Sequence, residues 1–163
     1  MVTTRKNTGQ GKKQQRRYVT GEIVPYYEVC PDVRPEMRRI AVRNHPRLPD
    51  DVYNLVDAYC GDPRCDCRVI YIFVIGDSRP GRTLANITFG WELLEFYRKW
   101  MGIEKADDTV RALKGPALMS MAPQTDLAPV LLELVSPRLQ ETEYVELLKR
   151  HYHQFKATLR KNT

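Results

Sequence analysis

The sequence predicts a single α+β domain with a small antiparallel sheet, a cysteine-rich corner and a helical C-terminal half. Three cysteines, Cys60, Cys65 and Cys67, lie within eight residues of one another. The most apolar run of the chain, residues 69–75, follows them directly and predicts a buried strand. After residue 90, segments with helical periodicity alternate with glycine and proline breakers, and no segment repeats.

Two short strands are expected in the proline-rich segment before residue 50, near residues 21–27 and 37–42. A helix is expected over residues 52–59, because apolar side chains recur there at the spacing of one helical face. That helix would place Cys60 at its C-terminal end. The apolar residues of this face are Val52, Leu55, Val56 and Tyr59.

A β-hairpin is expected after the cysteines. Residues 67–76 and 83–90 are rich in β-branched and aromatic side chains, which favour strands. The segment 77–81 between them has the proline and glycine chemistry of a hairpin turn. Four helices should follow, separated by glycine or proline. They are expected over about residues 91–101, 105–113, 126–135 and 142–160.

The net charge of +6 resides in one segment. Residues 1–17 carry six basic and no acidic side chains, whereas residues 18–163 carry 20 of each. Residues 1–17 are therefore expected to form a disordered basic tail, and residues 18–163 the single domain. The tail either solvates the chain or binds nucleic acid or another polyanion through counterion release. Its basic residues are Arg5, Lys6, Lys12, Lys13, Arg16 and Arg17.

The expected compartment decides how the cysteines are interpreted. No apolar run approaches the ~20 residues that a membrane helix needs, and the N-terminus lacks the apolar segment of a secretory signal. We therefore expect a cytoplasmic protein, with no membrane association. In a reducing compartment, clustered thiols are more often metal ligands than disulfides.

The spacing of the three cysteines predicts one structural zinc ion per chain. Cys65 and Cys67 are two residues apart at the entry to a strand, so their side chains share a face, and the turn after Cys60 brings its side chain back. Three thiolates are three of the four ligands of tetrahedral zinc. Cys30 is favoured as the fourth because it would complete an all-thiolate site, with His45 or water as alternatives.

The other histidines and arginines are expected to be structural. His151 falls on the apolar face of the last expected helix, which is typical of a core histidine hydrogen-bonded to a neighbour. His153 falls on the opposite face and should be solvated. A second group of basic residues is expected to pair with nearby acids, although it could also meet phosphates. Its members are Arg38, Arg39, Arg43, Arg47, Arg64 and Arg68.

Three short motifs suggest a family. They are Tyr59-Cys60-x-Asp62-Pro63-x-Cys65-Asp66-Cys67-Arg68, Phe89-Gly90-Trp91 and His151-Tyr152-x-x-Phe155-Lys156. Together they resemble a family of uncharacterised bacterial proteins, over roughly residues 45–158. The resemblance implies a bacterial source, and such a family has no assigned activity to carry over.

The sequence thus predicts a small zinc-binding protein that acts by binding, to nucleic acid or to a protein partner, and names no catalytic residue. A zinc-dependent hydrolase-like enzyme is the first alternative, with water in the fourth position and His151 or an aspartate as base. The His-x-Glu step of zinc deaminases is absent from the sequence. A protein–protein interaction module that docks through the helical half is the second alternative.

Overall fold

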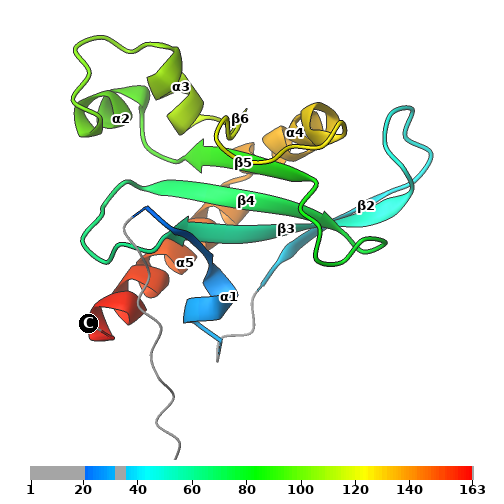
Figure 1. Cartoon of the computed structure of the whole chain (residues 1–163), viewed down its shortest axis with the longest axis horizontal. Helices are drawn as coiled ribbons and strands as arrows, with labels where there is room; N and C mark the ends of the chain where they lie inside the picture. Colours follow the sequence, from blue (N-terminus) through cyan, green and yellow to red (C-terminus); the bar gives the residue numbers. More distant parts are fainter. Residues whose placement is uncertain (1–20, 32–35, 163) are drawn as a thin grey trace, which may run out of the picture.

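A six-stranded antiparallel sheet organises the chain in the computed structural model, which describes residues 21–31 and 36–162. The strand order is β1-β3-β4-β5-β6, and β2 pairs with β3 as well (Figure 1). This antiparallel sheet, with most of the helices in the C-terminal half, confirms the α+β class. The strands are β1 (Ile23–Pro25), β2 (Arg38–Val42), β3 (Asp51–Cys60), β4 (Val69–Gly76), β5 (Ala85–Gly90) and β6 (Ala117–Leu118).

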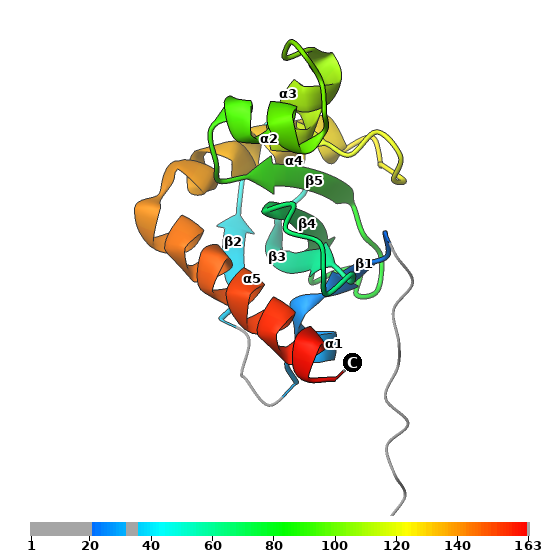
Figure 2. The ribbon, with the colours of Figure 1, turned by 90° about the vertical axis from the view of Figure 1, so that its left-hand side faces the viewer.

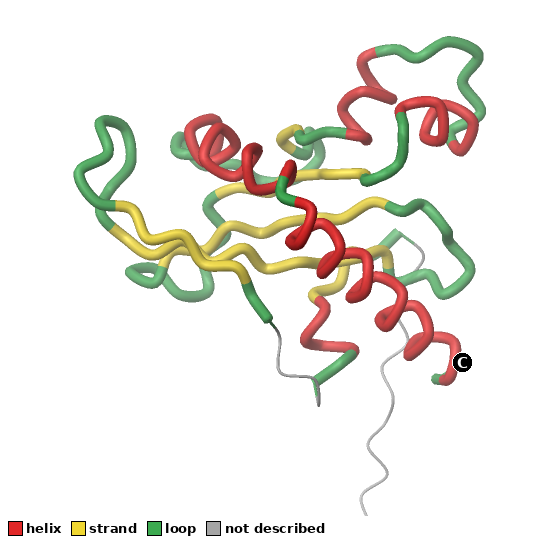
Figure 3. The backbone as a smooth tube through the Cα atoms, turned by 180° about the vertical axis from the view of Figure 1, so that it is seen from behind, coloured by secondary structure: helices red, strands yellow, loops and turns green. Residues whose placement is uncertain are grey.

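Helices occupy most of the second half of the chain and pack in two places. The long helix α5 runs diagonally across the back of the sheet (Figure 3), whereas α2 and α3 lie beyond β5 (Figure 2). None of the described helices is long and apolar enough to cross a membrane. The helices are α1 (Tyr26–Val29), α2 (Leu94–Trp100), α3 (Asp108–Lys114), α4 (Ala128–Val135), the 3-10 helix η1 (Ser136–Gln140) and α5 (Thr142–Lys161).

The two packing sites give two hydrophobic clusters. The larger one lies between the sheet and α4, η1 and α5. The smaller one surrounds Cys60 and Cys67 and is completed by α2 and α3. Strand β3 contributes to both, because successive side chains of a strand point to opposite faces. Tyr59 belongs to the larger cluster, and the next residue, Cys60, to the smaller one.

The expected helix over residues 52–59 is wrong, since this segment is β3 in the middle of the sheet. Tyr53, Leu55 and Tyr59 alternate toward the larger cluster, which is the period of a strand. The fourth inward position is Asp57, and this polar residue interrupts the apolar alternation. Pairing with β4 on one edge and with β1 and β2 on the other therefore overrides the local helical spacing.

The other expected elements are largely confirmed. The hairpin of β4 and β5 is present, and the four expected helices correspond to α2, α3, α4 and α5, with ends shifted by a few residues. The short helix α1 replaces the second half of the first expected strand. The expected basic tail of residues 1–17 lies outside the described residues.

Candidate metal centre and the buried histidine cluster

Three cysteine side chains meet where β3 ends and β4 begins. Cys60 is the last residue of β3, and Cys65 and Cys67 lie in the connection to β4. The three thiols are close enough to shift the pKa values of one another. Cys60 and Cys67 are buried, whereas Cys65 is half-buried. The sequence spacing therefore does bring these three side chains together, beside Tyr97 and Met101 near α2.

The surroundings of the cluster favour negative charge at Cys60. The hydrogen bond from Cys67, the backbone N–H of Asp62 and the charge of Lys156 together lower the pKa of Cys60 to about 5, against the opposing effect of burial. The pKa of Cys67 is raised, first by its hydrogen bond to Cys60 and then by burial. Burial also raises the pKa of Cys65. The cluster therefore favours a single thiolate, at Cys60.

A buried lysine fastens the turn after β3. Lys156 of α5 is 1% exposed, and its Nζ donates to the carbonyl oxygens of Cys60 at 2.6 Å and Asp62 at 2.7 Å. These bonds satisfy the ammonium and two carbonyls that face it, as a buried charge requires. Lys156 is part of the third sequence motif, but no role was predicted for it. The available signal is its position directly after Phe155 and four residues after Tyr152, on the buried side of α5.

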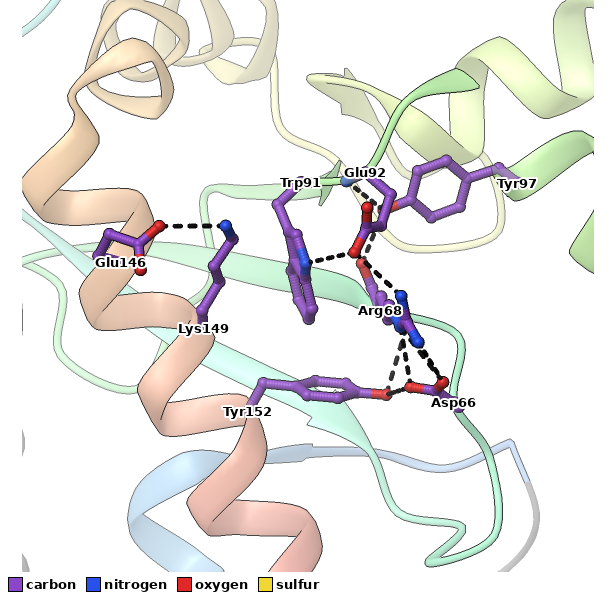
Figure 4. Close-up of polar contacts among 8 residues, drawn as sticks. All are labelled: Asp66, Arg68, Trp91, Glu92, Tyr97, Glu146, Lys149 and Tyr152. Carbon is purple, nitrogen blue, oxygen red and sulfur yellow. Dashed lines mark hydrogen bonds and ion pairs between the residues drawn. The ribbon is translucent and has the colours of Figure 1, made fainter. Parts of the chain in front are cut away.

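Arg68 fastens the other end of the turn (Figure 4). Its guanidinium donates to Asp66 Oδ2 at 2.9 Å and Glu92 Oε1 at 3.1 Å. Its backbone N–H donates to the hydroxyl of Tyr152 at 3.3 Å, and its carbonyl accepts from the hydroxyl of Tyr97 at 2.8 Å. The Arg68 hydrogen bond lowers the pKa of Asp66, while burial opposes the shift. The segment after Cys67 is thus tied both to α2 and to α5.

The candidates for a fourth ligand lie elsewhere. Cys30 belongs to the larger hydrophobic cluster, and its thiol donates to Thr158 Oγ1 at 3.6 Å. His45 precedes β3, and its Nδ1 accepts from the backbone N–H of Arg47 at 3.0 Å. Because β3 has ten residues, about 30 Å separates its two ends, and Cys60 lies at the far one. Among the described residues, no group of three His, Cys, Asp or Glu side chains is arranged to hold a metal ion as it stands.

A polar cluster is buried on the opposite face of β3. The Nδ1 atom of His151 lies 2.8 Å from Oδ2 of Asp57, and these side chains are 6% and 8% exposed. The hydroxyl of Tyr59 donates to the same Oδ2 at 2.6 Å. The ring of Tyr26 stacks on the His151 ring, with centroids 4.1 Å apart. The expectation of a core histidine bonded to a neighbour is confirmed, and His153 is exposed as expected.

The phenols around Asp57 remain protonated. Burial first, and then the charge of Asp57, raises the pKa values of Tyr59 and Tyr144. The hydroxyl of Tyr144 is the one buried side-chain polar atom without a hydrogen-bond partner among the residues that the structure describes. Asp57 is therefore surrounded by neutral donors, with His151 as the one neighbour in this cluster that can carry positive charge. Sequence reasoning missed Asp57, because nothing local marks its long-range partner.

The second group of basic residues is mostly paired with acids, but only Arg64 and Arg68 pair with acids close in the sequence, as expected. Five of its six arginines form ion pairs within residues 36–162. Their partners are mostly on other elements, such as Glu141 beside α5 for Arg38 at 2.8 Å. The positive charges of these five arginines are thus balanced by neighbouring carboxylates. The pairs are Arg38–Glu141, Arg39–Asp77, Arg47–Glu133, Arg64–Asp62 and Arg68–Asp66.

The function of this chain is inferred here from its geometry alone. The resemblance to a bacterial family remains a prediction based on three short motifs. Comparison with protein-family models, with curated proteins and with solved structures finds no match to this chain.

Proposed function

We propose that the chain is a zinc-binding protein whose metal site is formed by the thiols of Cys60, Cys65 and Cys67. The observation that carries the proposal is that the three cysteines lie in one cluster and shift the pKa values of one another. With Zn–S bonds of about 2.3 Å, the sulfur atoms of a tetrahedral site lie about 3.8 Å apart. The thiols would have to deprotonate and their side chains rotate to reach this separation around an ion, because the described residues do not hold a ready-made metal site.

The proposed role of the ion is to hold the connection between β3 and β4. Lys156 and Arg68 fasten the two ends of this connection, and the metal would cross-link its middle. A cross-link of this kind stabilises a segment that has little regular secondary structure. Between residues 61 and 68 the chain forms no helix or strand, which is where such support is needed.

The proposed site has three protein ligands among the described residues. Since Cys30 and His45 lie elsewhere, water or a group from outside these residues would complete the tetrahedron. An open position is also what the hydrolase alternative requires. However, His151 is bonded to Asp57 on the other face of β3, so it does not serve as a base for metal-bound water. The aspartates next to the cysteines, Asp62 and Asp66, are paired with Arg64 and Arg68. We therefore favour binding over hydrolysis.

Metal analysis of untagged protein, purified without chelator, tests this proposal. We expect about one zinc ion per chain by elemental mass spectrometry, and its loss in Cys65→Ser, because two thiolates bind zinc much more weakly than three. Cys30→Ser and His45→Ala are matched controls that should retain the ion. A cobalt-substituted sample should show thiolate-to-metal charge-transfer bands that disappear in Cys65→Ser.

Two results would contradict the proposal. One is wild-type protein that binds no zinc even after reduction and reconstitution. The other is a folded Cys65→Ser variant with unchanged metal content. Loss of the ion in Cys30→Ser would instead mean that the metal sits at another site, because that thiol contacts Thr158 and not the three-cysteine cluster.

Binding of a polyanion is a separate proposal that now depends on residues 1–17 alone. The excess of basic over acidic side chains is confined to this segment. The arginines that might have extended the surface are mostly committed to ion pairs. Nucleic-acid association through Arg5, Lys6, Lys12, Lys13, Arg16 and Arg17 therefore remains a prediction from charge.

A further inference from the structure

A cavity of about 300 Å³ opens over β3. One side of its wall is the end of β4 with the turn that follows, and the other side lies next to the gap between β1 and β2. Both β1 and β2 pair with the same edge of β3, but β1 stops opposite Ala58 and β2 starts opposite Leu55. Val56 and Asp57 are left without a strand partner there, and both line the cavity. A volume of this size matches the lower end of pockets that bind small molecules.

The wall of the cavity is apolar and aromatic at its mouth. Tyr27 and Met37 line it and are 49% and 38% exposed. They are two of the five exposed large hydrophobic side chains among residues 21–31 and 36–162. Exposed aromatic and thioether groups beside a concave surface are typical of a ligand site.

The charged groups of the cavity are all acidic. Asp57 and Asp77 line it, and none of its lining residues is Lys, Arg or His. Asp77 is already engaged, since its Oδ2 accepts from Arg39 at 2.6 Å and its Oδ1 from the amide of Asn54 at 2.7 Å. Asp57 is therefore the carboxylate with capacity for a ligand.

The hydrogen bonds of Asp57 leave one oxygen free. Tyr59 and His151 both contact Oδ2, and within the described part of the chain no hydrogen bond ends on Oδ1. A buried carboxylate is stable when it is paired with positive charge. Its present partners include a phenol that stays neutral and a histidine that is charged only when protonated. A cationic ligand would supply the missing charge.

We propose that this cavity binds a small organic ammonium ion. The charged nitrogen would pair with the carboxylate of Asp57, and the apolar body would pack on Tyr27 and Met37. An ammonium over the face of a tyrosine gains a further cation–π contribution. The same chemistry can come from a free amine or from the lysine side chain of a polypeptide. This inference is independent of the proposed zinc site, because none of the three clustered cysteines lines the cavity.

Ligand-observed and protein-observed NMR titrations test this inference with three probes. Benzylammonium represents a free amine, Nα-acetyl-lysine methylamide represents a lysine side chain, and benzyl alcohol is the neutral isostere of the first. We expect one or both cations to bind and to shift the Met37 methyl signal, and benzyl alcohol to bind about tenfold more weakly or not at all. The stronger of the two cations identifies the source of the ligand.

Three variants of the full chain locate the binding. Asp57→Asn should weaken cation binding by about tenfold, because the charge is lost while the shape is kept. Asp77→Asn is the matched control on the same cavity and should bind as the wild type does, since Arg39 already neutralises Asp77. Tyr27→Ala, at an exposed position, should weaken binding severalfold without affecting the fold. If Asp57→Asn unfolds, this variant alone tests whether the cation binds in the cavity.

The inference is overturned if neither cation binds to the wild-type protein. It is equally overturned if benzyl alcohol binds as tightly as benzylammonium, which would mean an apolar cavity without cation selectivity. Unchanged binding in Tyr27→Ala, or in a folded Asp57→Asn, would place any bound cation at another surface.

Discussion

The two faces of β3 carry two buried clusters that are built in opposite ways. The three-cysteine cluster is assembled from residues within eight positions of one another. The cluster on the other face joins Asp57 to His151, which are 94 residues apart in the sequence. The local cluster could be predicted from spacing, whereas the long-range one required the structure. A cluster can therefore be predicted from the sequence when its residues are close together in the chain. Its contribution to the fold does not depend on that closeness.

Both clusters nevertheless depend on the same helix. The helix α5 delivers His151 to the carboxylate of Asp57, and five residues later it delivers Lys156 to the turn after β3. The first contact joins side chain to side chain, and the second joins a side chain to backbone carbonyls. The two regions are therefore expected to respond differently when α5 loses one of these groups.

The largest effect is expected from His151→Ala. This change leaves the buried carboxylate of Asp57 with Tyr59 as its remaining hydrogen-bond partner, and it removes the stacking surface of Tyr26. Removing one member of a buried polar pair costs about 4 kcal/mol of unfolding free energy. Urea denaturation followed by circular dichroism would measure the loss.

His153→Ala is the matched control for this prediction. His153 is an exposed residue on the same helix and makes edge contacts with the rings of Trp91 and Tyr152. Its removal should cost less than about 1 kcal/mol, as for other surface substitutions. Equal losses in the two variants would show that the Asp57–His151 contact adds nothing beyond helix packing.

The failure to predict this cluster has a physical cause. An acidic residue in a strand usually marks a solvent-facing position. Asp57 therefore interrupts the apolar alternation of Tyr53, Leu55 and Tyr59, from which a strand would be predicted. Its burial is possible because α5 brings a hydrogen-bonding partner to it. No local pattern encodes that partner, and the segment was therefore predicted as a helix. In contrast, β4 and β5 were predicted correctly because their turn and composition are local.

A somewhat smaller loss is expected from Lys156→Met. Methionine keeps the length and helix preference of the side chain, but it leaves the carbonyls of Cys60 and Asp62 without their shared donor. Loss of two charge-assisted hydrogen bonds at a buried site should cost about 3 kcal/mol. Hydrogen exchange of the amides in residues 61–65 would show that the turn, and not the His151 cluster, opens first.

Lys149→Met on the same helix tests whether charge alone explains this effect. Lys149 is partly exposed and pairs with Glu146 at 3.1 Å (Figure 4). An ion pair of this kind contributes about 0.5 kcal/mol or less. If Lys149→Met destabilised the chain as much as Lys156→Met, the carbonyl contacts would not be the cause. Lys156 also shows the limit of sequence interpretation, because lysine is rarely expected to be buried.

The smallest expected effect is a pH-dependent change in stability at Asp66. This residue lies at the exposed edge of the cysteine corner, whereas Lys156 contacts its buried interior. Arg68 lowers the pKa of Asp66 below the ordinary 3.8 in the folded protein. The ionised carboxylate therefore stabilises the folded state at neutral pH, and this contribution is lost as the pH falls through the lowered pKa. Asp66→Asn should destabilise the protein at pH 7 by less than about 1 kcal/mol, because the carboxylate is largely solvated.

The pH dependence of this difference identifies its origin. At pH values below the folded-state pKa of Asp66, the wild type is protonated in both states, so its stability should approach that of Asp66→Asn. Denaturation of both proteins in urea between neutral pH and about pH 3 would measure the convergence. A difference that stayed constant across this range would mean that the Arg68 ion pair does not stabilise the corner. In that case the Tyr97 and Tyr152 contacts to the backbone of Arg68 would hold it alone.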